Sequence, residues 1–227
     1  MNQIVTTGIV LRRINYGEAD RIITYITPDT GKISLIAKGT RKPKSKLAGS
    51  IELFGESQLT FIVGKGDLGS LISARLIQNY GNIVKDLSRT NVAYQVIQLI
   101  NKHLEFASGG EFYDLVKNSY VSLNDLNIDL RITKVWFGLN FLVIMGHQPQ
   151  LLVKTLDDDV ISYSFDLNTM EFIEDDNAEY TRNDIKFLRL ASSQKPIFLS
   201  KIQSSNLSLE RLSILLESMM RSNGFDY

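Results

Sequence analysis

The chain has 227 residues, 44% of them hydrophobic, which is enough to build the cores of two domains. Its 25 Lys and Arg balance its 25 Asp and Glu, but the two signs are unevenly distributed. Residues 1–80 contain 11 Lys and Arg against 6 acids, whereas residues 81–227 contain 14 against 19. This asymmetry predicts an anionic partner, such as a nucleic acid, that contacts only the first part of the chain.

The composition also excludes several kinds of site. Because there are no cysteines, the chain has no disulfides and no thiolate metal ligands, which is typical of a reducing cytoplasm. The start, MNQIVTTGIV, lacks the basic residues and apolar core of a signal peptide. The longest apolar stretch, residues 135–145, is interrupted by Gly138 and Asn140 and is too short to span a membrane. We therefore expect a cytoplasmic protein without membrane contact, metal or other cofactor.

Residues 4–80 predict five short β-strands separated by turn residues. The strand-like runs are IVTTGIVLRR at 4–13, RIITYIT at 21–27, KISLIA at 32–37, QLTFIV at 58–63 and SLISARLI at 70–77. Apolar residues alternate at 33, 35 and 37 and again at 59, 61 and 63, as in strands buried on one face. The turns PDTG at 28–31 and GKGDLG at 64–69 predict hairpins. Five such strands predict a closed barrel of the OB type in residues 1–80, with an SH3-like barrel as the alternative.

After Gly81 the apolar spacing becomes helical, which predicts a second, α-helical domain over residues 81–227 and an α+β chain overall. Helices are expected at about 89–105, after the Gly pair at 109–110, at 130–145, at 184–191 and at 207–220. The third is apolar nearly all round, as a central helix is, and Gly146 is placed to end it. The segment 150–182 is acidic, with Lys154 and Arg182 as its only bases. Its runs VISYSF and MEFI, separated by DLNT, predict a β-hairpin inserted between helices.

The main candidate site is the segment 38–46, KGTRKPKSK, which we call the basic loop. Gly39 and Pro43 make a continuous helix or central strand unfavourable there, so its cations are expected on a turn. They are Lys38, Arg41, Lys42, Lys44 and Lys46. Together they predict a clamp on nucleic-acid phosphates, with salt-dependent affinity, and the alternative is a solvated loop without a ligand.

Other residues of the barrel could extend this interface. Arg12, Arg13, Arg21 and Arg75 are candidate DNA-binding cations, although strand alternation predicts that Arg12 and Arg13 point to opposite faces. Tyr16 and Tyr25 are candidates for stacking on bases, with packing in the barrel as the equal alternative. Packing is the favoured interpretation for Phe54. Phosphate contacts and stacking carry little base information, so binding should be largely indifferent to sequence.

Catalytic interpretations are weaker. Asp157, Asp158 and Asp159 could hold Mg²⁺ in a nuclease, but three adjacent acids in an extended chain point in different directions, and a solvated turn is favoured. His147 has no triad partners nearby in sequence, and the chain contains no phosphate-binding G-x-x-x-x-G-K-[ST] motif. The sequence therefore gives no basis for nucleotide hydrolysis.

Three segments together resemble the bacterial DNA repair protein RecO family. They are GIVLRR at 8–13, NYGEADR at 15–21 and GKISLIAKGTRKPKSKLAG at 31–49, supported by AYQ at 93–95 and GHQP at 146–149. The resemblance implies an OB domain that binds DNA, a helical domain and often a four-cysteine zinc ribbon. Here Lys154 and Asp157, then residues 172–175, stand about where the two cysteine pairs are expected. The acidic segment is therefore interpreted as a metal-free remnant of the ribbon.

The resemblance also implies a function and partners. A protein of this family binds single-stranded and double-stranded DNA, promotes annealing, and with RecR assists loading of RecA onto DNA covered by single-strand-binding protein. It acts in the bacterial nucleoid without covalent chemistry, so we expect no enzyme. The C-terminal tail of single-strand-binding protein would bind the helical domain, where the candidate flanking cations are Arg131, Lys134, Lys186, Arg189 and Lys201. The alternatives are a metal-dependent nuclease or phosphodiesterase that uses the acidic segment, and a structural adaptor.

Overall fold

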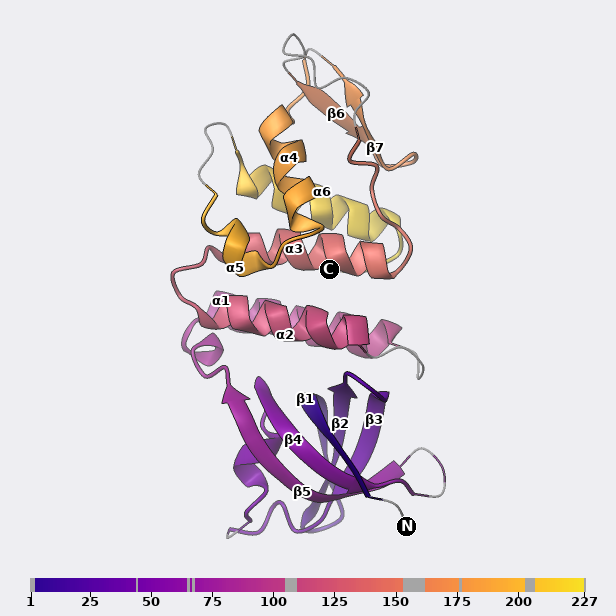
Figure 1. Cartoon of the computed structure of the whole chain (residues 1–227), viewed down its shortest axis with the longest axis vertical. Helices are drawn as coiled ribbons and strands as arrows, with labels where there is room; N and C mark the ends of the chain where they lie inside the picture. Colours follow the sequence, from indigo (N-terminus) through magenta and orange to yellow (C-terminus); the bar gives the residue numbers. More distant parts are fainter. Residues whose placement is uncertain are drawn as a thin grey trace. The chain divides into compact units, whose positions relative to one another are not determined.

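A computed structural model of the chain describes residues 3–43, 45–64, 66, 68–104, 110–152, 162–175, 177–202 and 207–226 (Figure 1). By its internal contacts the chain forms two compact units, Met1–Asn124 and Asp125–Tyr227. The boundary expected after Tyr80 marks the change from strands to helices. The first unit continues beyond it because two helices pack on the barrel.

The first unit contains a closed five-stranded barrel, which confirms the predicted OB-type fold. Its strands are β1 (Gln3–Tyr16), β2 (Asp20–Thr27), β3 (Gly31–Ala37), β4 (Gly55–Ile62) and β5 (Leu68–Asn79). Around the barrel their order is β1-β2-β3-β5-β4, and all neighbours are antiparallel except β3 and β5. A 3₁₀ turn, η1 (Ala48–Ile51), follows the basic loop. Both predicted hairpin connections, after β2 and after β4, join antiparallel neighbours.

The barrel core consists of the inward-facing residues of all five strands. They include Val10, Ile23, Tyr25, Leu35, Ala37, Leu59, Phe61 and Leu71. The predicted alternation holds within the strands, since Leu35 and Ala37 are buried on β3 and Leu59 and Phe61 on β4. Val63, expected to continue the β4 face, lies beyond the end of the strand and is 57% exposed.

The barrel closes where β3 meets β5 through three parallel residue pairs, Ser34 to Ile36 with Leu68 to Ser70. Gly69, in the middle of this seam, has no room for a side chain. A Cβ atom there would lie 2.7 Å from the Leu35 side chain and 2.9 Å from the carbonyl oxygen of Ile62. The glycine is therefore required by the close approach of the strands.

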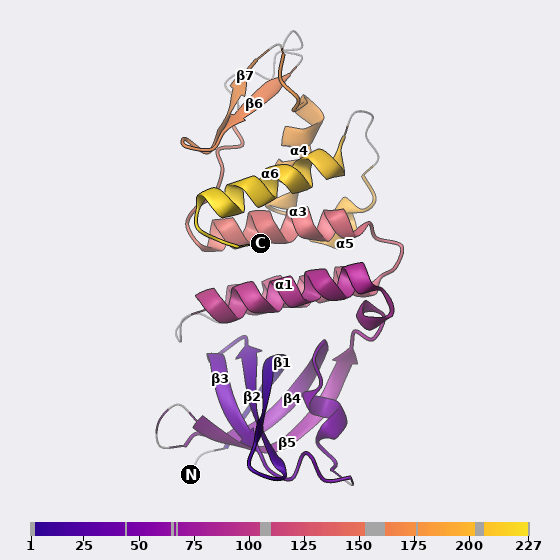
Figure 2. The same ribbon diagram turned by 180° about the vertical axis from the view of Figure 1, so that it is seen from behind.

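Two helices, α1 (Leu87–His103) and α2 (Gly110–Asn124), lie side by side against the barrel (Figures 1 and 2). The turn η2 (Ile83–Lys85) leads into α1. Asp86 caps α1 by accepting a hydrogen bond from the backbone of Arg89 at 3.0 Å. The apolar spacing predicted both helices, because their inward faces bury residues such as Val96, Ile100 and Tyr120.

A buried carboxylate ties α2 to the barrel. Glu56 on β4 is 4% exposed and accepts hydrogen bonds from the hydroxyls of Tyr113 at 2.6 Å and Tyr80 at 3.4 Å. Lys117 supplies the compensating charge at 2.9 Å. Burial, followed by the hydrogen bond to Glu56, raises the pKa of Tyr113. This phenol therefore stays protonated and keeps donating to the carboxylate at physiological pH.

The second unit is built around one apolar helix, as predicted. Its elements are α3 (Leu130–Ile144), β6 (Tyr163–Asp166), β7 (Glu171–Glu174), α4 (Arg182–Ala191), α5 (Pro196–Leu199) and α6 (Leu209–Ser222). The helix α3 contacts α4, α5 and α6. Gly138 on α3 faces Leu216 on α6, where a Cβ atom would be in ordinary van der Waals contact at 3.5 Å. The sequence pattern missed only the short α5 among these helices.

The acidic segment forms the expected hairpin, with β6 and β7 antiparallel. Its core is aromatic, because the ring of Phe172 lies 4.8 Å from that of Phe165 and 5.7 Å from that of Tyr180. Lys154 and residues 157–159 lie outside the described residues. At the position where the resemblance implies the second cysteine pair, a buried phenylalanine packs against its neighbours. Apolar packing thus holds the described part of this hairpin.

Candidate nucleic-acid interface

The basic loop is fastened to the turn between β1 and β2. The backbone N–H of Arg41 donates to the carbonyl of Ala19 at 2.9 Å, and its guanidinium donates to the carbonyl of Gly17 at 3.1 Å. The backbone N–H of Gly39 donates to the Asp20 carboxylate at 2.8 Å. Gly39 has a φ of 68°, a left-handed conformation that glycine adopts without strain. These bonds give the described part of the loop a defined path.

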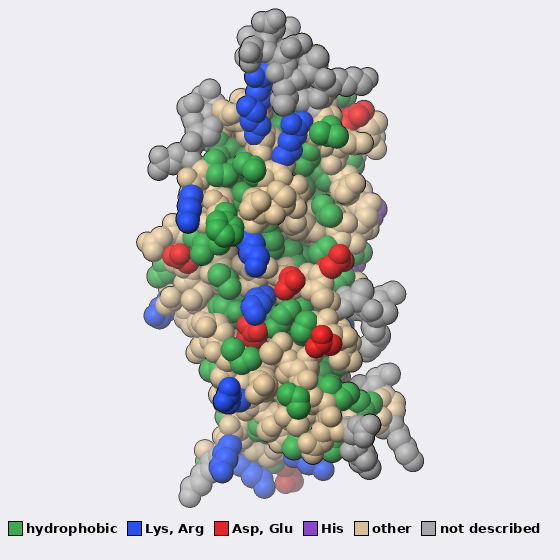
Figure 3. Space-filling model, viewed as in Figure 1, with side chains coloured by type: hydrophobic (Ala, Val, Ile, Leu, Met, Phe, Trp, Pro, Cys, Tyr) green, Lys and Arg blue, Asp and Glu red, His purple; other side chains and the backbone are tan. Residues whose placement is uncertain are grey.

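The cations of this loop face solvent. Lys38, Arg41, Lys42 and Lys46 are all exposed, while Lys44 lies outside the described residues. Figure 3 shows Lys and Arg side chains gathered at this end of the barrel, at the bottom of the view. Side chains displayed in this way can each approach a phosphate without first leaving a buried partner.

Arg13 and Arg21 lie at the same end but share a carboxylate. Glu52 is 2.5 Å from the guanidinium of Arg13 and 3.9 Å from that of Arg21. Since the Glu52 side chain is 54% exposed, water screens these pairs and each contributes little to stability. A phosphate group could take the place of the carboxylate at low cost.

Arg12 and Arg75 lie on strands β1 and β5, and Arg12 lines a cavity beside α1. Arg12 is opposite Thr24, whereas Arg13 is opposite the core residue Ile23, so the two neighbours face opposite sides as predicted. Arg12 and Arg13 therefore do not belong to one surface of the barrel. Arg75 is exposed on β5, which pairs with β3 and β4.

Of the aromatic candidates, only Tyr16 is accessible. It ends β1 beside the turn that holds the basic loop, and it is 51% exposed. Tyr25 is fully buried in the barrel core, so the prediction that it stacks on bases is wrong for this structure. Phe54 is also buried, packed edge-on against Tyr94 and Tyr120. The predicted packing role of Phe54 is confirmed.

We expect Tyr25→Phe to raise the free energy of unfolding by about 1 kcal/mol. The Tyr25 hydroxyl is buried and has no hydrogen-bond partner among the residues that the structure describes, and its burial raises the pKa of the phenol. Urea denaturation measures the gain in stability, and a single-stranded DNA titration should give unchanged affinity. Unchanged or reduced stability of the Tyr25→Phe variant would contradict an unsatisfied hydroxyl in the folded protein.

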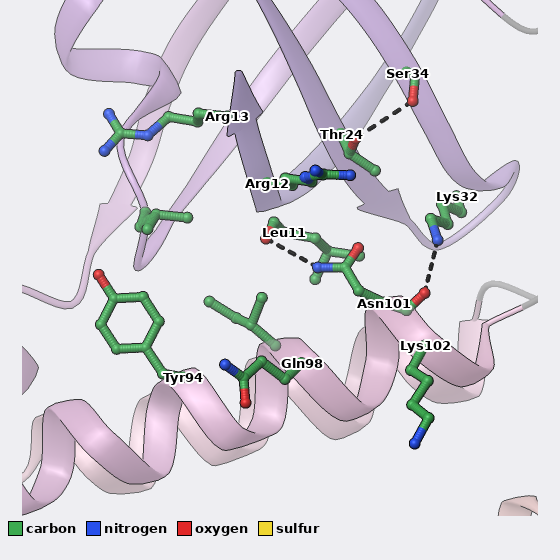
Figure 4. A pocket seen from close by; sticks show the side chains of 12 residues that line it. Leu11, Arg12, Arg13, Thr24, Lys32, Ser34, Tyr94, Gln98, Asn101 and Lys102 are labelled. Carbon is green, nitrogen blue, oxygen red and sulfur yellow. Dashed lines mark hydrogen bonds between the residues drawn. The ribbon is translucent and has the colours of Figure 1, made fainter. Parts of the chain in front are cut away.

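A second group of polar residues surrounds a cavity of about 710 Å³ between the barrel and α1. Figure 4 shows Arg12 and Lys32 approaching it from the strands, and Gln98 and Asn101 from the helix. Asn101 donates from its side chain to the carbonyl of Leu11 at 3.1 Å, and its own carbonyl accepts from Lys32 at 2.9 Å. The sequence did not indicate this site, because its two walls are about 70 residues apart in the chain.

Several cations proposed for the helical domain are already engaged. Arg131 pairs with Asp129 and Glu210, and Lys134 pairs with Glu217 at 2.7 Å. The remaining three are Arg189, which donates to the carbonyl of Leu151 at 2.6 Å, and the exposed Lys186 and Lys201.

Exposed apolar side chains lie on α4, which carries Lys186, and on α5, which is followed by Lys201. Leu190 is 43% exposed, Ile197 39% and Phe198 53%. The ammonium group of Lys201 is 5.7 Å from the centre of the Phe198 ring. We call Leu190, Ile197 and Phe198 the apolar patch.

The described residues contain no group of three or more His, Asp or Glu side chains placed to hold a metal ion. Asp157, Asp158 and Asp159 lie outside those residues. In the same described part of the chain, no helix has the length and apolar character needed to cross a membrane.

Comparisons with known proteins identify the barrel. Residues 1–80 match the family described as "Recombination protein O N terminal". The DNA repair protein RecO of Acetivibrio thermocellus is 36% identical over 151 residues, which cover 66% of this chain and 59% of that protein. The DNA repair protein RecO of Listeria monocytogenes is 32% identical over 146 residues, covering 63% of this chain and 56% of that protein.

The protein of the same name from Thermoanaerobacter sp. is 32% identical over 152 residues, covering 66% of this chain and 61% of that protein. The chain thus spans about three fifths of the length of the curated relatives it matches. The aligned lengths exceed 80 residues, so the similarity includes helical segments as well as the barrel. The N-terminal barrel of this chain is thus similar to the N-terminal domain of recombination protein O, and the aligned part of the chain is similar to DNA repair proteins RecO.

Proposed function

We propose that this protein is a mediator of DNA repair and homologous recombination that binds single-stranded and double-stranded DNA through the basic loop. The observation that carries the proposal is the loop itself, with four exposed cations on a backbone fastened to a barrel that matches the N-terminal domain of recombination protein O. Tyr16, beside the loop, would supply a face for base stacking. The site of action would be the nucleoid of a bacterial cytoplasm.

The proposed activity is annealing of complementary strands without covalent chemistry. Two DNA strands repel each other through their phosphates, and a cationic loop that screens both backbones lowers this barrier. Base pairing then selects the partner strand, because contacts to phosphates carry no sequence information. With RecR as a partner, the same binding would assist loading of RecA onto DNA covered by single-strand-binding protein.

The C-terminal tail of single-strand-binding protein is the proposed ligand of the second unit. An acidic, partly apolar tail requires an apolar surface flanked by cations. The apolar patch provides such a surface, and Lys186 and Lys201 are the flanking cations that remain exposed. Arg131 and Lys134 are less suitable because their charges are already paired with Glu210 and Glu217.

Replacing Lys38, Arg41, Lys42 and Lys46 together by glutamine tests the DNA site. We expect affinity for single-stranded DNA at low salt to fall about 100-fold, since each lost phosphate contact removes a counterion-release contribution. The slope of log affinity against log salt should decrease by about 3, at roughly 0.7 per contact. Fluorescence anisotropy titrations of a labelled oligonucleotide at several salt concentrations measure both quantities.

The matched control changes the same number of exposed charges in the second unit, at Lys186, Lys195, Lys201 and Arg221. It should retain the affinity and salt slope of the unmodified chain. If the two variants have the same affinity for DNA and the same salt slope, the basic loop is not part of the DNA site. Cleavage of DNA in the presence of Mg²⁺ that is lost on replacing Asp157, Asp158 and Asp159 by asparagine would instead support the nuclease alternative.

A further inference from the structure

The cavity between the barrel and α1 is strongly cationic. Four described residues of its lining are Lys or Arg, namely Arg12, Arg13, Lys32 and Lys102, and no described lining residue is Asp or Glu. The Arg13 guanidinium is paired with Glu52, so Arg12 and Lys32 are the main cations available to a ligand. Burial, and then the charge of Arg12, lowers the pKa of Lys32. Positive charges that repel one another in a partly buried space are stabilised by an anion, and a dianion compensates them better than a single charge.

Neutral polar groups in the cavity suit an oxyanion as well. The Thr24 and Ser34 hydroxyls lie 3.3 Å apart, so one of them can turn to donate to a ligand. Gln98 adds an amide donor from the side of the helix. Combined with guanidinium and ammonium groups, such donors can surround the three peripheral oxygens of a phosphate group.

The shape of the cavity limits which phosphate can enter. The bonds from Asn101 to Leu11 and from Lys32 to Asn101 join the helix to strands β1 and β3 along one side. A continuous strand therefore cannot pass between the helix and the barrel without breaking them. A group that projects from the end of a chain can enter from the open side.

We propose that this cavity binds the terminal phosphate of a nucleotide, a phosphomonoester, with Arg12 and Lys32 as the principal ligands. The phosphate could belong to the end of a DNA strand or to a free nucleotide, and its chemistry at the site is the same. At neutral pH a phosphomonoester carries nearly two negative charges, whereas an internal phosphodiester carries one. The choice of a DNA end as the biological source rests on the proposed function, but the site is separate from the basic loop.

The test compares three forms of one oligonucleotide with the full chain: a 5′-phosphate, a 3′-phosphate, or hydroxyls at both ends. We expect one phosphorylated form to bind about tenfold more tightly than the hydroxyl form, as charge-assisted hydrogen bonds to one group provide. In an Arg12→Gln, Lys32→Gln variant the two affinities should become equal. The variant with four glutamines in the basic loop should bind all forms more weakly but keep their ratio.

A second variant guards against misfolding, since Lys32 also bonds to Asn101. Arg12→Gln alone leaves that bond intact and should reduce the preference for the phosphorylated end about threefold. Competition by thymidine monophosphate that needs Arg12 and Lys32 would support recognition of the phosphomonoester itself. Tighter binding of the mononucleotide than of the phosphorylated end would support a free nucleotide as the source, and the reverse order would support a DNA end. Equal affinity of the unmodified chain for all three forms, or a preference that survives in the double variant, overturns the proposal. The proposal is also overturned if an acidic peptide competes with the oligonucleotide in a way that needs Arg12 and Lys32, while thymidine monophosphate does not compete.

Discussion

Replacing Asp184 by alanine should lower the free energy of unfolding of the second unit by about 3–5 kcal/mol. Its carboxylate is fully buried and joins two helices. It accepts hydrogen bonds from the backbone N–H of Thr181 at 2.8 Å and from the Thr181 hydroxyl at 2.9 Å, which completes the cap of α4. It also pairs with Arg211 on α6 and accepts from the backbone of Ser208 at 3.3 Å. Alanine removes all these bonds and leaves the Arg211 guanidinium without its buried counter-charge.

The only tryptophan in the chain makes this effect measurable. Trp136 lies on α3, is 6% exposed and donates to the carbonyl of Gln194 at 2.8 Å, so its fluorescence reports unfolding of the second unit. Urea denaturation followed at this residue gives the change in stability. Glu210→Ala removes an acid that is 69% exposed and should change stability by less than about 0.5 kcal/mol.

A double-mutant cycle separates the ion pair from the cap. Adding Arg211→Met to Asp184→Ala should recover part of the lost stability, because the Arg211 guanidinium, which is only 22% exposed, then no longer faces the site of the lost carboxylate. If Asp184→Ala denatures at the urea concentration of the unmodified chain, the buried network does not hold α4 and α6 together.

In the first unit, Glu56→Ala should cost about 3 kcal/mol of stability. The Tyr80 and Tyr113 hydroxyls would lose a buried acceptor, and α2 would lose its charged connection to β4. The cost should be smaller than at Asp184 because the Lys117 side chain is 40% exposed and can be hydrated when its partner is removed.

Two probes locate the effect of Glu56→Ala. Hydrogen exchange at the amides of α2 should accelerate, while urea denaturation followed by Trp136 fluorescence should not change, since that residue belongs to the other compact unit. Glu52→Ala, which removes an exposed acid, should leave both unchanged. Unaltered exchange in α2 of the Glu56→Ala variant would show that the carboxylate does not fasten this helix.

The sequence predicted the barrel because its strands alternate and its turns are short. It left Tyr25 open between stacking and packing for a physical reason: the later part of β2 is buried on both faces, so apolar alternation gives way to a continuous run. Residues there cannot be assigned to the inside or outside from periodicity alone. The helices were predicted more closely, because each buries one face at helical spacing.

The charged residues of the basic loop were easier to place from the sequence than the residues that contact Lys32 or Glu56. The five cations of the basic loop lie close together in the segment 38–46, which also contains Gly39 and Pro43, so their place on a loop could be inferred. The cavity could not, since Lys32 and Asn101 meet only after the chain has folded. Likewise Glu56 resembles an ordinary surface acid until Tyr113 and Lys117, about 60 residues later, cover it.

The bonds between the basic loop and the β1–β2 turn also bear on how fast DNA can bind. Fixing the backbone of a mobile loop costs about 1–2 kcal/mol of conformational entropy per residue. Around Gly39 and Arg41 the hydrogen bonds already fix the backbone before DNA binds. Binding to a preorganised cationic surface needs no slow rearrangement after collision. The encounter rate should therefore be governed by long-range attraction and decrease steeply as ionic strength rises.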